Sequence, residues 1–235
     1  RTSTQAAMHR VLRHWGRTMR RAVELLLGAR IEVRGEERLP EGGALIAAKH
    51  QSELDVVLLG ELMPHTGAVA MQELTRYPFF GPILERLDLV LVAVDQGPQG
   101  RTQQVVEGAR RIRAQGRPLI VYPEGELMKL GARERYRKGI GHIYATLGEP
   151  VYPVAKSLGV IWPQRRWRKN TGVTGAMEVL EPIPPGLPLE AFMEELERRI
   201  EEGSMRLIRE HAPEAERAAA ERRHAAGVNN HSEPA

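Results

Sequence analysis

A histidine and a carboxylate lie five positions apart in residues 49–55, whose sequence is KHQSELD. An apolar run from 44 to 48 precedes this stretch, and a second apolar run from 56 to 59 follows it, a pattern typical of a strand that leads into a helix. On one continuous helix, His50 and Asp55 would point about 140° apart. A direct contact therefore requires His50 before the helix and Asp55 in its first turn.

Ser52 favours that arrangement, because Ser52 and Asp55 form the S-x-x-D pattern of a helix N-terminus with Ser52 as the N-cap. His50 would then lie on the preceding turn, beside a carboxylate that the helix N-terminus keeps ionised. Such a pair suits general-base catalysis, in which Asp55 fixes the imidazole tautomer while His50 removes a proton from a hydroxyl. The same residues also fit an ordinary helix start preceded by a polar loop histidine.

The elements around this stretch predict an α/β fold, a single domain with a mostly parallel central sheet flanked by helices. His50 directly follows a predicted strand, and active sites of such sheets gather at the carboxyl ends of strands. Strands are expected at 31–34, 44–48, 68–71, 89–94, 119–122, 151–155 and 173–180, and helices at 53–63, 79–87, 102–115, 137–147 and 189–210.

A basic amphipathic helix of about five turns, ending near Gly28, is predicted at the N-terminal end of the sequence. Such a helix can lie in a membrane interface, or it can pack on the domain with a solvated charged face. Both alternatives stay open. One face carries apolar residues and the other arginines: Met8, Val11, Leu12, Trp15, Met19, Ala22, Val23 and Leu26 against Arg10, Arg13, Arg17, Arg20 and Arg21.

Cysteine content, charge distribution and the length of the apolar runs limit the classes of protein to which this sequence can belong. The 235 residues include no cysteine, which excludes disulfides and thiolate chemistry. The formal net charge is only +4, but residues 1–34 hold eight arginines against two glutamates, which points to an anionic surface near the N-terminal part. The longest unbroken apolar run, 89–94, is far shorter than the roughly 20 residues that span a bilayer.

A second candidate site follows the predicted strand at 119–122, where Pro123, Glu124 and Gly125 end the strand and leave a carboxylate at its carboxyl end. Tryptophan and basic residues alternate in 162–169, but no nucleic-acid-binding fold accompanies them, so no nucleic-acid partner is expected. We divide the chain into the N-terminal helix (1–30), one domain (31–210) and a charged tail (211–235), in which a frayed helix beyond Pro213 becomes disordered from about Gly227.

Four sequence blocks together resemble the glycerolipid acyltransferase family typified by bacterial 1-acyl-sn-glycerol-3-phosphate acyltransferase. The first is the His50-x4-Asp55 block with Ser52. The others are Glu73-Leu74 with Pro78-Phe79-Phe80-Gly81, Tyr122-Pro123-Glu124-Gly125, and Val151-Tyr152-Pro153-Val154-Ala155 with Gly159 and Trp162. Their order and spacing agree with the family from about residue 31 to 210.

The resemblance implies transfer of an acyl group from acyl-CoA or acyl carrier protein to the hydroxyl of a lyso-lipid. His50 would be the base and Asp55 its orienting partner, with Ser52, Glu124 and Gly125 on the substrate side. No metal or prosthetic group is implied; the acyl thioester is a co-substrate. An anionic membrane surface is the expected partner, on the cytoplasmic face of the inner membrane, in phospholipid biosynthesis.

Departures from the family pattern concern the acceptor phosphate. Family members usually place cations at the positions of Met71, Gln96 and Leu127, and a threonine at Glu126. A phosphate held in a partly dry site requires charge-assisted donors. Replacement cations are sought in neighbouring positions, at Arg76, Lys129 or Arg101.

Three functions remain open at this point. The first is acylation of 1-acylglycerol-3-phosphate through a rearranged phosphate site, which we favour. The second is acylation of a lyso-lipid without a phosphate. The third is a catalytically silent, membrane-associated lipid-binding protein, against which the intact His50 and Asp55 pair argues.

Overall fold

The computed structural model describes residues 2–63, 65–78, 81–93 and 95–227. Its centre is a sheet of strands in the order β1-β7-β6-β2-β5-β3-β4. Every neighbouring pair is parallel except β6 and β7, which are antiparallel, so the predicted mostly parallel sheet is confirmed. The strands are β1 (Arg30–Arg34), β2 (Leu45–Ala48), β3 (Gly67–Met71), β4 (Val90–Val92), β5 (Leu119–Val121), β6 (Val151–Lys156) and β7 (Thr174–Val179).

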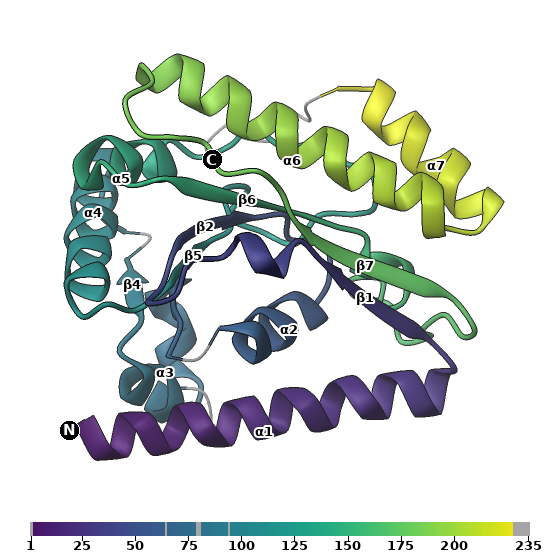
Figure 1. Ribbon diagram of the computed structural model, residues 1–235, viewed down its shortest axis with the longest axis horizontal. Helices are drawn as coiled ribbons and strands as arrows, with labels where there is room; N and C mark the ends of the chain where they lie inside the picture. The colour runs from purple at the N-terminus through teal and green to yellow at the C-terminus, as the bar shows by residue number, and fades with distance from the viewer. Residues whose placement is uncertain (1, 64, 79–80, 94, 228–235) are drawn as a thin grey trace.

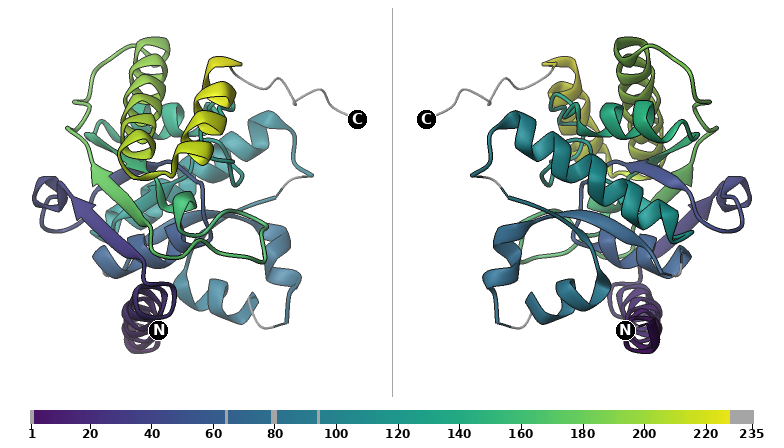
Figure 2. Two further views of the ribbon diagram at one scale, coloured as in Figure 1. Left: turned by 90° about the vertical axis from the view of Figure 1, so that its right-hand side faces the viewer. Right: turned by 90° about the vertical axis from the view of Figure 1, so that its left-hand side faces the viewer.

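Helices cover both faces of the sheet (Figure 1). On one face α4 (Pro98–Ala114), α5 (Gly139–Leu147) and α6 (Leu189–His211) pack on one buried apolar cluster. On the other, α1 (Thr2–Leu27) and α2 (Leu54–Leu62) contribute to a second cluster. Figure 2 shows α1 end-on, across the sheet from α6. The predicted α/β class with flanking helices is therefore confirmed.

The short central strands are buried on both faces, which explains why their sequences are continuous apolar runs. All four residues of β2 have side chains with no solvent exposure. Leu45 is in register with Leu119 of β5 on one side and with Val151 of β6 on the other. The carboxyl ends of β2, β5 and β6 therefore meet at one edge of the sheet.

Helix α1 is longer than the predicted five turns, and it is rotated relative to the predicted apolar face. His9, Gly16 and Val23 face inward and are buried, and α1 lies against α2. By contrast, four apolar side chains of α1 are exposed, with exposed fractions of 62% for Val11, 47% for Trp15, 83% for Leu25 and 78% for Leu26. A single helix thus has one face packed on the domain and an apolar surface that nothing in the described chain covers.

The remaining elements are short turns and the C-terminal helices. The 3-10 turns are η1 (Glu36–Arg38), η2 (Gln72–Arg76) and η3 (Leu158–Val160), and α3 is Gly81–Leu87. Beyond Pro213, α7 (Glu214–Ala225) packs back on the domain through the buried Ala220. The predicted disordered tail falls mainly on residues 228–235, which lie outside the described residues. Within the described residues, none of the helices combines the length and the hydrophobicity that a bilayer-spanning segment requires.

Close packing of α6 on β6 depends on Gly203. A Cβ at Gly203 would lie 2.8 Å from the Ala155 Cβ and 3.2 Å from a Leu180 methyl. Overpacking of this kind typically costs about 1–3 kcal/mol. We therefore expect Gly203→Ala to lower the free energy of unfolding, measured by urea titration.

The matched control is Gly60→Ala in α2, where an added Cβ meets nothing within 4 Å. Alanine is a better helix former than glycine by about 1 kcal/mol, so this variant should gain stability. Equal effects of the two substitutions would contradict the close contact between α6 and β6.

Candidate functional site

The turn between β2 and α2 brings His50 and Asp55 together. His50 Nδ1 lies 3.0 Å from Asp55 Oδ2, and the same oxygen accepts hydrogen bonds from the Gln51 N–H (2.7 Å) and the Ser52 N–H (3.0 Å). His50 precedes the helix and Asp55 is in its first turn, as the sequence requires for a direct contact. With Nδ1 donating its proton to Asp55, Nε2 is left as the basic nitrogen.

The prediction of Ser52 as the N-cap of α2 is wrong by one residue: the N-cap is Glu53, which makes no side-chain capping hydrogen bond, and Ser52 lies just before it. The Ser52 hydroxyl accepts a hydrogen bond from the Leu54 N–H (3.2 Å) and donates one to the Trp162 carbonyl (2.9 Å). The Ser52 N–H donates a hydrogen bond to the Asp55 carboxylate. The side chain of Ser52 is completely buried. Its hydroxyl is therefore committed to protein partners.

Asp55 is a fully buried carboxylate. Burial in itself raises the pKa of Asp55, but the Lys156 charge, the His50 contact and the Ser52 N–H act in the opposite direction and leave the pKa below its usual value. Asp55 is thus ionised at neutral pH and can stabilise an imidazolium on His50.

Tyr122 fixes the other side of the histidine ring. The two rings are stacked, with centroids 4.1 Å apart and an interplanar angle of 22°. Burial raises the pKa of Tyr122 well above that of a free tyrosine, and the charges of Asp55 and Glu124 add to this effect. The tyrosine therefore stays neutral and restrains the imidazole by contact.

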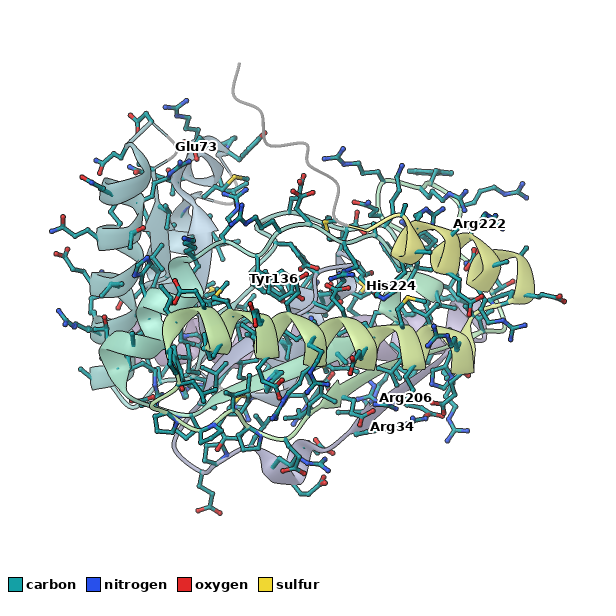
Figure 3. All side chains as sticks on the ribbon, turned by 90° about the horizontal axis from the view of Figure 1, so that it is seen from above. Arg34, Glu73, Tyr136, Arg206, Arg222 and His224 are labelled. Carbon is teal, nitrogen blue, oxygen red and sulfur yellow. The ribbon has the colours of Figure 1, made fainter. Side chains whose placement is uncertain are left out.

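A buried ionic cluster lies on the opposite face of the β2 end. Lys49 Nζ is 2.7 Å from Glu124 Oε1 and 2.6 Å from Glu201 Oε1, and it donates a further hydrogen bond to the Ala132 carbonyl (3.1 Å). Tyr136 also donates to Glu201 (2.9 Å); Figure 3 shows Tyr136 alongside α6, which carries Glu201. The cluster connects directly to the histidine, because Glu124 Oε2 accepts the His50 N–H at 3.0 Å.

Burial and mutual contact shift the pKa values of both Lys49 and Glu124. Burial lowers the pKa of Lys49, but pairing with Glu124 and Glu201 outweighs that effect, and its pKa is raised. Burial raises the pKa of Glu124 to about 7; Lys49 opposes this shift, whereas Glu201 adds to it. Near neutral pH the Glu124 carboxyl is therefore close to the midpoint of its titration, beside the charged Lys49.

Glu124 and Gly125 have different positions relative to the surface. The Glu124 carboxylate is enclosed and contacts Lys49. It also accepts the hydrogen bond of the His50 N–H and so holds the backbone of the turn between β2 and α2. Gly125 is exposed and has φ of 76°, a left-handed conformation that favours glycine. A Cβ at Gly125 would overlap the guanidinium of Arg137.

Arg137 is a cation beside the site that sequence reasoning missed. Its side chain is exposed, and its Nε donates to the Glu124 carbonyl at 3.3 Å. The Arg137 N–H is anchored to the Pro123 carbonyl at 2.8 Å. A basic side chain thus lies against the Pro123–Gly125 turn, although Leu127 occupies the position at which the family usually has a cation.

The other predicted cations are not brought into contact with the His50–Asp55 pair. Arg76 is exposed on η2, where it lines a pocket of about 440 Å³ with Gln72, Glu73, Thr75, Ala93 and Asp95. Lys129 is exposed shortly after Gly125, next to Met128, whose N–H donates to the His50 carbonyl at 2.7 Å. The side chains of Met71 and Gln96 are also exposed.

A possible metal-ligand group lies away from this site. Glu32, Glu210 and His211 offer ligand atoms within 4.8 Å of one another. Arg34 pairs with both glutamates, at 2.5 Å and 2.6 Å, and already supplies a positive charge there. We assign no metal to this group.

Sequence reasoning also missed three of the buried charges, Lys49, Lys156 and Glu201. The sequence held a signal for two of these buried charges. Lys49 directly follows an apolar strand, and Lys156 is the last residue of another. Glu201 had no comparable signal, since glutamates are common throughout α6. The assembled arrangement can take a proton at His50 Nε2 and stabilise the resulting imidazolium through Asp55.

Comparisons with known proteins show the fold and the family of this chain. The fold is similar to the crystal structure of a 1-acyl-sn-glycerophosphate acyltransferase from Thermotoga maritima, with a TM-score of 0.68 and 24% identity over 85% of this chain and 79% of that chain. A 1-acyl-sn-glycerol-3-phosphate acyltransferase from Pseudomonas aeruginosa is 29% identical over 69% of this chain and 63% of its own length. One from Cocos nucifera is 27% identical over 67% and 49%.

The chain therefore spans about half to two thirds of the length of these curated relatives. The family model described as Acyltransferase matches residues 30–157, which is more than half of the chain. This match begins at β1, ends just after β6, and includes both His50 and Asp55. The chain belongs to the acyltransferase family.

Proposed function

We propose that this chain is an O-acyltransferase that moves a fatty acyl group from acyl-CoA or acyl-ACP to the hydroxyl of 1-acylglycerol-3-phosphate, a step of phospholipid biosynthesis. The observation that carries the proposal is the 3.0 Å contact between His50 Nδ1 and a buried, ionised Asp55 at the carboxyl end of β2. The family match and the names of the relatives support the reaction class.

In the proposed reaction, His50 Nε2 takes the proton of the acceptor hydroxyl as its oxygen attacks the thioester carbonyl. The new ester C–O bond forms and the C–S bond of the thioester breaks. The proton on His50 then passes to the departing thiolate, so the enzyme ends in its starting state. Asp55 stabilises the imidazolium that exists between the two proton transfers.

Direct transfer between the substrates fits the residues around His50. Ser52 is buried and its hydroxyl is bonded to the Trp162 carbonyl, so it is poorly suited to be a nucleophile. The chain contains no cysteine. A covalent acyl-enzyme therefore has no evident carrier here.

The acceptor assignment depends on cations that replace those expected at Met71, Gln96 and Leu127. Arg137 supports a phosphate-bearing acceptor, because its guanidinium lies against Gly125, in the loop whose Glu124 holds the His50 N–H. The exposed Glu126 nearby favours the alternative, a lyso-lipid without a phosphate. We place Arg137 at the acceptor phosphate and give Arg76 and Lys129 secondary, more distant roles.

Association with an anionic membrane surface is part of the proposal. The exposed apolar side chains of α1 flank exposed arginines at positions 10, 17 and 21. Apolar residues can enter the acyl region while arginines bind anionic head groups. We place this surface at the cytoplasmic face of the inner membrane, where the lyso-lipid acceptor would be met.

Removing the base should abolish catalysis. We expect His50→Ala to lower kcat/KM at least about a hundredfold, because general-base catalysis is lost. The rate is measured as thiol release from acyl-CoA in the presence of 1-acylglycerol-3-phosphate. His142→Ala in α5, on the opposite face of the sheet, is the matched control and should retain activity. Activity of His50→Ala close to that of the wild type would overturn the assigned role.

The acceptor preference tests the phosphate. 1-Acylglycerol-3-phosphate should be acylated faster than the monoacylglycerol that lacks its phosphate, and Arg137→Gln should lower kcat/KM for the phosphate-bearing substrate alone, about tenfold or more. Arg222→Gln on α7, seen apart from Tyr136 in Figure 3, is the control. Equal rates with the two acceptors would favour the non-phosphate alternative.

Vesicle binding tests the surface of α1. A Leu25→Glu/Leu26→Glu double variant should co-sediment less with anionic lipid vesicles, because two exposed apolar side chains become charged. Leu187→Glu, at a position 38% exposed in the connector before α6, is the matched control. Unchanged binding of the double variant would show that this part of α1 does not contact the membrane.

A further inference from the structure

A second lysine is buried on the other side of the catalytic turn, at the carboxyl end of β6. Lys156 has no solvent exposure, and its Nζ lies 3.5 Å from Asp55 Oδ1. Neither of these two atoms has a hydrogen-bond partner in the part of the chain that the structure describes. The pair is therefore held by charge in a closed space.

The two oxygens of Asp55 have different surroundings. Oδ2 receives donors from His50, Gln51 and Ser52, whereas Oδ1 faces the Lys156 ammonium. A carboxylate that is removed from water stays ionised only where another charge or donor compensates for the lost solvent. Lys156 is the side chain that provides this compensation at Oδ1.

Tyr122 joins the lysine to the histidine. Lys156 Nζ lies 4.9 Å from the centroid of the Tyr122 ring, and His50 stacks on the same ring. A cation at this distance from an aromatic ring is attracted by the ring electrons. Lys156, Tyr122, Asp55 and His50 thus form one compact group, with Lys156 enclosed behind the residues that face the substrate.

We propose that Lys156 is a positioning residue for the acyl transfer: it is the buried counter-ion of the Asp55 carboxylate and, through Asp55, holds the His50 ring in place before the substrates react. The inference rests on the proposed function of the His50–Asp55 pair. Lys156 itself has no access to the substrate, because its side chain is completely buried.

The charges around the pair support this role. The titratable groups that face it are Lys156 from β6, Tyr122 and Glu124 after β5, and His50 itself. Burial lowers the pKa of Lys156 below its usual value, and the charges of Asp55 and Glu124 oppose this shift without reversing it. Lys49 neutralises much of the Glu124 charge, which leaves Lys156 as the cation opposite Asp55.

Loss of the Lys156 charge should make proton uptake by the His50–Asp55 pair easier, whether the proton resides on the ring or on the carboxylate. A proton on the His50 ring removes the base, and a proton on Asp55 removes its ionised partner. The two groups therefore titrate as a unit. The acid limb of the pH profile must therefore move to higher pH when Lys156 becomes neutral. A single nearby charge commonly shifts a titration by about 1–3 pH units.

The primary test is Lys156→Met, which keeps the length of the side chain and removes its charge. The acid limb of kcat/KM should move up by about one pH unit or more, with kcat reduced and KM for both substrates unchanged. A purely structural role would lower the amount of active enzyme without moving the profile. A folded variant with the kcat and pH profile of the wild type would overturn the proposal.

A second comparison covers the case in which Lys156→Met folds poorly. The proposal predicts that Asp55→Asn restores the stability of Lys156→Met, because both buried charges are then gone. Lys49→Met is the matched control: it also removes a fully buried lysine, but its partners are Glu124 and Glu201, so Asp55→Asn should not restore it. Equal thermal stability of the Lys156→Met single and double variants would overturn the pairing.

The proposed function and the role of Lys156 can be disproved separately. If His50→Ala retains activity, the proposed function itself is lost. If His50→Ala is inactive while Lys156→Met behaves as the wild type, only the role of Lys156 is lost. In the Asp55→Asn background, Lys156→Met should cause no further loss of kcat, since Lys156 acts through Asp55; an additive loss would contradict this.

Discussion

Carboxylates that lose their water must find positive charge or hydrogen-bond donors inside the protein, and this requirement organises the end of β2. Asp55, Glu124 and Glu201 are all enclosed there. Two buried lysines meet them from opposite faces of the sheet, Lys156 at Asp55 and Lys49 between the two glutamates. His50 lies between the two groups, bonded through its ring to one and through its backbone to the other.

The parallel sheet makes this meeting possible. β2 lies between β5 and β6 with their residues in register, so residues that follow or end these strands converge although they are far apart in the sequence. The alternation of side chains then separates them, sending Lys49 toward α6 and Lys156 toward α2. The fold therefore supplies both the position of the histidine and two separate compartments for its supporting charges.

Local pattern was sufficient to predict the strands and, to within one residue, the start of α2, and it allowed a contact between His50 and Asp55; the family resemblance was needed to favour that contact over an ordinary helix start. Each of these depends on neighbours within a few residues, such as the Ser52 pattern at the helix start. The buried lysines were not predicted, because their partners come from other elements and an isolated lysine after a strand usually reaches water. The rotation of α1 was missed for a related reason: which apolar face is buried depends on its packing against α2.

The site also depends on segments that are far apart in the sequence. Lys49 and Glu201 are separated by 152 positions, so a ribosome releases the catalytic turn long before the helix that brings the second carboxylate. Without α6, Lys49 at the end of β2 lacks its contact with Glu201, and the sheet lacks the helix that packs on that part of its face. The charge cluster is therefore complete only when α6 is in place, and a chain that ends before α6 has the catalytic pair without its full set of supporting charges.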